Sequence, residues 1–255
     1  MTPAGRVGGG PVAAPVRYDG LDAEELGRRT GATEVQVLAS VGSVLDVAHQ
    51  RAAAGAESGL LVLADAQTAG RGRSGRAWHS PPGAGVYLAA LLRPAVRPFS
   101  GALAVRVGLA AAAAIEDLAP GASPRLKWPN DLVVAGRKTG GVLCEARWSG
   151  ARQGWVAVGV GVNVAGPVPA VVRGTAIALA EVAAGATRVA LLEALVPRIW
   201  ALAGRPAALD EAEREAVRGR LWVEPGAEAP VGVDGDGALL VLGLEGTLER
   251  RVSPG

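Results

Sequence analysis

Residues 125–138 read Arg-Leu-Lys-Trp-Pro-Asn-Asp-Leu-Val-Val-Ala-Gly-Arg-Lys, and this stretch decides the fold prediction. Short runs on either side of Ala135-Gly136 predict two strands, 125–128 and 132–134, and the Ala-Gly pair fits a hairpin turn. The runs 140–147 and 155–164 predict two further strands. The centre of the chain is therefore expected to build a β-sheet.

The same stretch holds most of the lysine and asparagine of the chain. The 255 residues contain two lysines and two asparagines, against 24 arginines. Three of those four residues, Lys127, Asn130 and Lys138, lie within twelve positions of one another. A compact ammonium cannot be exchanged for a planar guanidinium where reacting atoms crowd together, so a lysine that persists in such an arginine-rich composition marks a candidate reaction centre.

Length and composition limit the class of protein. A chain of 255 residues with 49% hydrophobic content can form one sizeable cored domain and a small one. The apolar run 108–115 ends at Glu116 and is too short for a membrane span. The single cysteine, Cys144, excludes an internal disulfide and favours a reducing cytoplasm. The formal charge of +2 is too small to argue for nucleic acid.

Composition divides the chain into three parts. Residues 1–20, which lack the apolar core of a signal peptide, are expected to form a flexible tail. Residues 21–205 are expected to form the main domain. Residues 206–255 carry ten acidic residues against five arginines and are expected to form a linker helix and a small β-barrel. Periodicity in the main domain predicts helices at 21–29, 43–54, 102–118 and 187–202, and further strands at 34–41, 60–64 and 86–92.

A glycine- and arginine-rich break at 70–85 imitates a dinucleotide-binding motif. Its Gly-x-Gly-x-x-Gly spacing follows a predicted strand, but Pro81-Pro82 prevents a helix from following, and no acidic residue lies about 20 positions later to meet a ribose. Two interpretations remain from the residues alone. The three arginines of the loop can close over a phosphate or carboxylate, or they can belong to an ordinary charged surface loop.

Three segments together carry a family resemblance. They are Gln67-Thr-Ala-Gly-Arg-Gly-Arg-Ser-Gly-Arg-Ala-Trp-His-Ser-Pro81, Lys127-Trp-Pro-Asn-Asp131 followed by Lys138 and Gly141, and Gly159-Val-Gly-Val-Asn163. These segments resemble, in order, the signature segments of the biotin protein ligases. The similarity runs from about residue 37 to residue 164. It implies an α/β (α+β) catalytic domain, a mixed sheet flanked by helices as in class II aminoacyl-tRNA synthetases, followed by a small SH3-like β-barrel.

The resemblance also implies an activity. Members of the family use Mg-ATP to convert biotin into biotinoyl-5′-AMP and then transfer the biotinoyl group to a lysine of a carboxylase's biotin carboxyl carrier domain. Both steps build negative charge on oxygen, so the site needs fixed positive charge more than covalent chemistry. The implied partner is the carrier domain, without nucleic acid or membrane, and the expected assembly is a monomer or a weak homodimer.

Roles for individual residues follow from the resemblance. Lys138 and Arg73 are the expected catalytic residues. The expected biotin site comprises Ser43, Val44, Leu45, Gln67, Arg71, Gly72, Arg73, Lys138, Gly141, Gly159 and Gly161. The expected ATP site comprises Arg73, Arg76, Trp78, Lys127, Asn130, Asp131, Lys138 and Asn163, of which Asp131 and Asn163 are also the candidate Mg²⁺ ligands.

Several of these residues have an alternative structural interpretation. Gly159 and Gly161 can simply relieve crowding in a sheet, and Trp78 can be a core residue. Lys127 can pair with an acid such as Asp131 instead of touching substrate.

One departure from the family pattern lies in the expected biotin site. Members usually read Ser-Thr-Asn where this chain reads Ser43-Val44-Leu45, and Ser43 is also expected to cap the helix that starts there. Valine is nearly isosteric with threonine, so the shape is kept while one hydrogen bond, about 0.5–1.5 kcal/mol, is lost. We expect weaker biotin binding and not loss of function. His49 shows no spacing typical of a metal site or a triad, and no function is predicted for it.

Three other functions are alternatives to this one. Some family members are biotin-sensing repressors with a winged helix before the catalytic domain, but 33 residues precede the first predicted strand here, fewer than a winged helix needs. A lipoate or octanoyl ligase or transferase would share the fold and a key lysine, although the Arg-Gly-Arg loop argues against it. A basic loop that binds nucleic acid is the alternative outside these enzymes.

Overall fold

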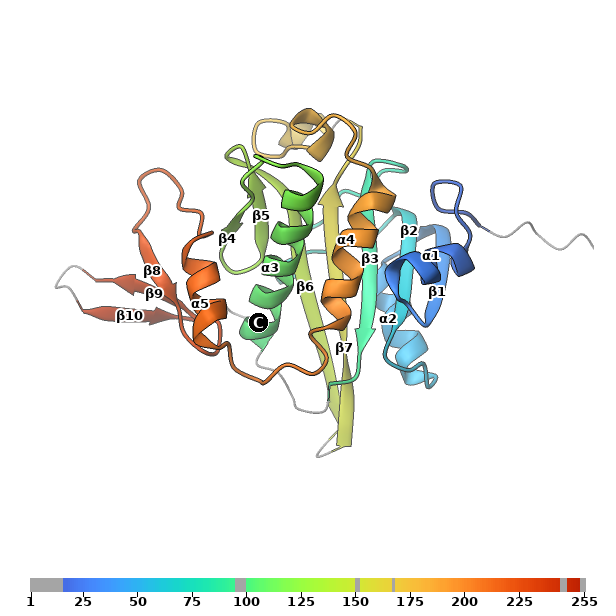
Figure 1. The fold of residues 1–255 in the computed structure, drawn as a ribbon, viewed down its shortest axis with the longest axis horizontal. Helices are drawn as coiled ribbons and strands as arrows, with labels where there is room; N and C mark the ends of the chain where they lie inside the picture. Colours follow the sequence, from blue (N-terminus) through green and yellow to red (C-terminus); the bar gives the residue numbers. More distant parts are fainter. Residues whose placement is uncertain (1–15, 95–99, 150–151, 167, 244–246, 253–255) are drawn as a thin grey trace, which may run out of the picture.

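The computed structural model describes residues 16–94, 100–149, 152–166, 168–243 and 247–252. Its centre is a seven-stranded mixed sheet with the order β1-β2-β3-β7-β6-β5-β4 (Figure 1). Strands β1 and β2 run parallel, and the other neighbours are antiparallel. The strands are β1 (Glu34–Val41), β2 (Leu60–Gln67), β3 (Gly85–Leu92), β4 (Arg125–Lys127), β5 (Asp131–Val134), β6 (Arg137–Ser149) and β7 (Arg152–Asn163).

Helices cover the two faces of the sheet unequally. On one face lie α1 (Ala23–Thr30), α3 (Ser100–Leu118) and α4 (Arg188–Trp200), and on the other α2 (Val44–Ala53) packs on β2, β3 and β7. Strand β3 is buried on both sides, because Leu88 belongs to the core under α3 and α4 while Leu91 packs with α2. Apolar side chains on successive positions of β3 therefore hold the two layers together.

The C-terminal unit is small and is joined to the main domain by an apolar cluster between α3 and α5 and by polar contacts. It consists of α5 (Glu211–Arg218) and the strands β8 (Pro230–Val233), β9 (Leu239–Leu242) and β10 (Leu248–Arg251), which form a three-stranded antiparallel sheet. The buried Arg106 guanidinium on α3 pairs with Glu213 on α5, with Nε 2.8 Å from Oε1. This small sheet is compatible with the predicted barrel. Short 3₁₀ turns lie at Arg73–Gly75, Ala170–Val172 and Leu179–Glu181.

The local predictions for the main domain are confirmed, including the central hairpin. Ala135 and Gly136 both have positive φ, 48° and 72°, as a two-residue turn between antiparallel strands requires. Residues 1–15 of the predicted tail lie outside the described residues. The predicted tail reaches too far, because Tyr18 is buried in the core with its ring 4.3 Å from the Arg188 guanidinium carbon. No helix in the described part of the chain is long and apolar enough to cross a membrane.

Candidate active site

A cavity of about 360 Å³ lies beside α2 on the same face of the sheet. Its floor is formed by β6 and β7, where Gly141 is paired with Gly161 and Leu143 with Gly159. Since side chains alternate along a strand, Gly159 and Gly161 lie on one face and lower the floor to the level of the backbone. A methyl group at Gly161 would lie 2.6 Å from the Trp78 indole nitrogen, so the absence of a side chain there is what lets Trp78 settle onto the sheet.

One wall of the cavity is the start of α2. The backbone N–H of Val44 donates to the Gln67 side-chain oxygen at 3.0 Å, and the Gln67 amide nitrogen donates to the Ser80 hydroxyl at 2.9 Å. The predicted capping by Ser43 is wrong, because its hydroxyl makes no cap hydrogen bond and Gln67 satisfies the helix end instead. Ser43 is buried and lines the cavity, as does Leu45, whose side chain lies over Gly159.

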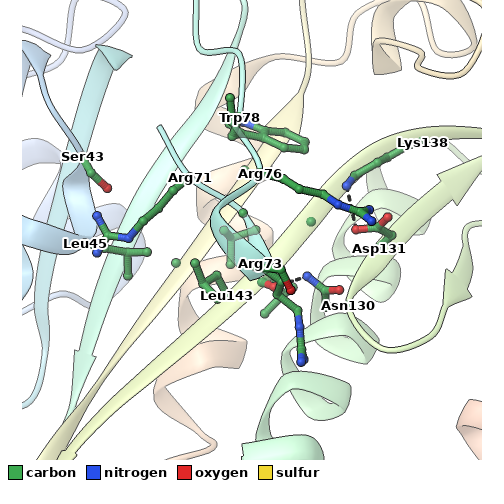
Figure 2. Close-up of a pocket in the computed structure, with 18 of the residues that line it drawn as sticks. Ser43, Leu45, Arg71, Arg73, Arg76, Trp78, Asn130, Asp131, Lys138 and Leu143 are labelled. Atoms are coloured by element: carbon green, nitrogen blue, oxygen red, sulfur yellow. Dashed lines mark hydrogen bonds and ion pairs between the residues drawn. The ribbon is translucent and has the colours of Figure 1, made fainter. Parts of the chain in front are cut away.

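The loop 70–76 lies over the floor. Its ends are tied together by hydrogen bonds from the Gly72 N–H to the Arg76 carbonyl, 2.7 Å, and from the Trp78 N–H to the Gly70 carbonyl, 2.8 Å. Ser74 has a positive φ of 53° inside the tight turn of the loop. The chain therefore folds back on itself and presents its arginine side chains around the cavity (Figure 2).

The opposite wall carries the cationic end of the cavity. The Lys138 ammonium lies 2.7 Å from a carboxylate oxygen of Asp131 and 5.2 Å from the centre of the Trp78 ring. Asn130 donates from its side-chain amide to the Val142 carbonyl at 2.7 Å. Figure 2 shows Lys138, Asp131 and Arg76 at this end and Ser43, Leu45 and Arg71 at the other. One end of the cavity is therefore lined by charged and amide side chains, and the other combines the apolar Leu45 with the Arg71 guanidinium.

Lys127 pairs with an acid, as the alternative interpretation predicted, but that acid is not Asp131. Its ammonium is paired with Glu224 of the C-terminal unit, whereas Asp131 pairs with Lys138. The adjacent Trp128 donates its indole N–H to the Gly237 carbonyl at 2.9 Å. The C-terminal unit thus contacts Lys127 and Trp128 and stabilises the position of the stretch 127–131. A charge match between residues about 100 positions apart gives no local sequence signal.

The structure brings the predicted site residues together with one exception. All of them line the cavity except Asn163, which stands at the end of β7 opposite Gly85 and donates from its amide to the Ile177 carbonyl at 3.4 Å. The pairing of Asp131 with Asn163 around Mg²⁺ is therefore not supported, because Asn163 lies beyond the cavity. Lining residues that the sequence did not predict include Leu88, Trp128, Val142, Leu143 and Val160.

Trp78 is not an ordinary core residue. Its indole N–H is buried and has no hydrogen-bond partner among the described residues. Its ring lines the cavity between the Gly161 floor and the Lys138 ammonium. An unmet buried donor is costly, on the order of 1–3 kcal/mol, so this donor is suited to a ligand acceptor.

Comparisons with known proteins agree with this architecture. The model of the biotin/lipoate A/B protein ligase family matches residues 41–163. The chain is 34% identical over 236 residues to the biotin--[acetyl-CoA-carboxylase] ligase of Mycobacterium tuberculosis, covering 87% of this chain and 86% of that protein. The biotin protein ligase from Aquifex aeolicus in complex with biotin and ATP aligns at a TM-score of 0.69 and 25% identity, covering 87% of this chain and 96% of that chain.

A further relative is longer than the region it shares with this chain. The bifunctional ligase/repressor BirA of Bacillus subtilis is 41% identical over 124 residues, which cover 48% of this chain and 38% of that protein. The match with the Mycobacterium tuberculosis protein extends over most of both chains and so decides the family. The chain belongs to the biotin protein ligase family.

Proposed function

We propose that this chain activates biotin with Mg-ATP as biotinoyl-5′-AMP and transfers the biotinoyl group to a lysine of a biotin carboxyl carrier domain of acetyl-CoA carboxylase or a related carboxylase. The observation that carries the proposal is the position of Lys138. Its ammonium stands at one end of a cavity whose floor is bare backbone and whose roof is an arginine loop. Such a site fits a compact bicyclic ring with a polar edge at one end and a reacting phosphate at the other.

In the first step, a carboxylate oxygen of biotin attacks the α-phosphorus of ATP, and pyrophosphate leaves with the electrons of the broken P–O bond. Negative charge spreads over the phosphoryl oxygens during this displacement. Lys138 and Arg73 are assigned to that charge, and Arg76 and Asn130 to the other phosphates. Mg²⁺ enters as part of the ATP substrate, and the Asp131 carboxylate offers it a hard oxygen ligand.

In the second step, the neutral amine of the acceptor lysine attacks the anhydride carbonyl. AMP leaves with the electrons of the C–O bond, and the nitrogen loses its proton. The mixed anhydride must not meet water before this happens. The loop 70–76, with Gly72 at its first bend, is assigned the task of covering the intermediate.

Recognition of biotin is assigned to the opposite end of the cavity. Ser43 and Gln67 offer a hydroxyl and an amide to the ureido group, and Leu45 and the glycine floor provide apolar surface. The Trp78 indole N–H is a further donor. We assign it a hydrogen bond to biotin or to the adenylate bound in the cavity.

The direct test is biotin-dependent exchange of labelled pyrophosphate into ATP by the purified chain. We expect exchange with biotin and background exchange with lipoate or octanoate. Exchange that depends on lipoate or octanoate would assign the chain to the other branch of the biotin/lipoate family. A gel shift with a steep salt dependence, without exchange with any acid, would instead favour the nucleic-acid alternative.

A further inference from the structure

A chain of polar contacts links α2 and the sheet to the first arginine of the loop. His49 lies on α2, Glu145 on β6 and Trp155 on β7. The Trp155 indole nitrogen is 3.0 Å from His49 Nδ1, and His49 Nε2 is 2.8 Å from Glu145 Oε2. Glu145 in turn receives the Arg71 guanidinium, with Nε 3.1 Å from Oε1 and one terminal nitrogen 3.1 Å from Oε2.

The chemistry of the indole fixes the direction of these hydrogen bonds. An indole N–H can only donate, so His49 Nδ1 must accept and the imidazole proton must lie on Nε2. His49 Nε2 then donates to Glu145. The His49 side chain is only 12% exposed, so water has little access to replace either contact.

The far end of this chain of contacts is also fixed. The Arg93 guanidinium carbon lies 5.6 Å from the centre of the Trp155 ring. The same guanidinium donates to the carbonyl of Ala52, in the last turn of α2, and to that of Ala56, which follows the helix, at 2.9–3.0 Å. Trp155 is therefore held against α2, and its hydrogen bond to His49 fixes the orientation of the imidazole ring.

The other end reaches the substrate cavity. Arg71 lines the cavity next to Ser43 and Leu45, at the end opposite Lys138 (Figure 2). Its second ion pair, 2.8 Å to the Asp46 carboxylate, involves an acid that is 55% exposed, whereas Glu145 is 23% exposed. Glu145 is thus the better shielded anchor for Arg71. The hydrogen bond from His49, together with those from Arg71, outweighs burial and lowers the pKa of Glu145 to about 2, so the anchor stays charged.

We propose that His49 is a positioning residue: held by Trp155, it fixes Glu145 and thereby Arg71, which sets the start of the loop over the biotin end of the cavity. This inference rests on the proposed function for its kinetic readout. Loss of the His49 contact weakens the placement of the loop at the biotin end. The effect at the ATP end should be smaller: Lys138 lies outside the loop, and Arg73 and Arg76 lie in the turn that the Gly72–Arg76 backbone hydrogen bond closes independently of Glu145.

A matched pair of variants distinguishes the hydrogen bond that His49 donates to Glu145 from the packing of its side chain. In His49→Gln the side-chain amide nitrogen reaches about as far as imidazole Nε2 and can still donate to Glu145. His49→Leu fills a similar volume and donates nothing. We expect His49→Leu to raise the KM for biotin about fivefold or more, the loss typical of one hydrogen bond to a buried or charged partner, with the KM for ATP within twofold of wild type. His49→Gln should stay within twofold for both substrates.

A second readout does not depend on catalysis. In the absence of ligands, trypsin should cut after Arg71 or Arg73 at least threefold faster in His49→Leu than in wild type or His49→Gln, because the loop has lost its anchor. Trp155→Phe, which keeps a ring but removes the N–H, should give the same direction of change and serves if His49→Leu does not fold. Thermal unfolding of each variant checks that the fold is intact.

The outcomes separate the two proposals. Equal biotin KM in wild type, His49→Leu and His49→Gln, or an equal rise in the KM values for biotin and ATP, would overturn the positioning role while leaving the ligase function in place. Absence of biotin-dependent exchange in the wild type would overturn the proposed function. The tryptic comparison then still decides whether His49 anchors the loop.

Discussion

Adding one methyl group at Gly161 tests how closely Trp78 and the sheet floor are matched. In Gly161→Ala the new Cβ would lie 2.6 Å from the Trp78 indole nitrogen and 2.7 Å from its neighbouring ring carbon. Ordinary contact begins at 3.4 Å, so the rigid ring must retreat by about 0.8 Å. Trp78 is only partly buried and can yield, so we expect destabilisation at the lower end of the roughly 1–3 kcal/mol typical of overpacking.

Catalysis should suffer more than stability. The Trp78 ring lies between the floor and the Lys138 ammonium, which is 5.2 Å from the centre of the ring. Displacement of the ring therefore alters the space in which the reacting groups align. A misplacement near 1 Å can reduce the rate on the order of 100-fold. We therefore expect kcat/KM for biotin-dependent pyrophosphate exchange to fall ten- to a hundredfold, by this same argument, while thermal unfolding shifts by only a few degrees.

A double-variant cycle shows whether the effect passes through Trp78. If it does, adding Gly161→Ala to a Trp78→Ala background should cost much less than it costs in wild type, because the clash is gone. Gly204→Ala is the matched control, since a methyl group there meets nothing within 4 Å. Additive losses in the cycle, or activity of Gly161→Ala within twofold of wild type, would refute this reasoning.

Three further predictions address the lysine, the helix wall and the C-terminal unit. Lys138→Arg should fold normally and lose at least tenfold in adenylate formation, because the larger guanidinium cannot occupy the ammonium position; a loss below twofold would contradict the assignment. Val44→Thr should tighten biotin binding by up to about tenfold, as measured by calorimetry, and unchanged or weaker binding would mean that this residue does not face biotin. Glu213→Gln leaves the buried Arg106 without its charged partner, although the Pro206 and Ala208 carbonyls still accept from it, and should destabilise the fold by about 3 kcal/mol at neutral pH. Burial opposes ionisation of Glu213, but hydrogen bonds led by that from Arg106 hold its pKa near 2, below the ordinary 4.5. The stabilisation by Glu213 is therefore complete above pH 4.5 and is lost as the pH falls toward 2, and chemical unfolding of the variant should show a flatter pH dependence across that range.

Local sequence signals predicted most of the sheet and much of the site. The Ala135-Gly136 pair predicted a tight hairpin turn, and both residues have the positive φ that such a turn needs. The rarity of lysine pointed to Lys138, whose ammonium does line the cavity. Each signal depends on neighbours along the chain or on the chemistry of one residue type, which a single sequence records.

Other features depend on partners that are distant in the sequence. Ser43 has the right type and place for a helix cap, yet the Gln67 side chain satisfies the helix end from another strand. Asn163 belongs to a signature segment, but the register of β7 against β3 carries it past the end of the cavity. His49 has no motif around it, because its partners, Glu145 and Trp155, are about 100 residues away. Strand register and tertiary packing decide these contacts, and neither can be predicted from the spacing of residues that are close in the sequence.

Leu45 and Gly159 fit against one another at the end of the cavity that we assign to biotin. The side-chain carbons of Leu45 lie about 3.0 Å from the position that a Cβ on Gly159 would occupy. A larger residue at 159 would collide with this leucine, so the apolar wall and the bare floor form one fitted surface. Since Val44 and Leu45 offer no side-chain hydrogen bond, polar recognition at this end falls to the remaining donors and acceptors, of which Arg71 is carried by the loop 70–76. An anchor for Arg71 matters more in such a site than in one with a full set of polar contacts, which is the physical reason that the effect of His49 should be found in the KM for biotin.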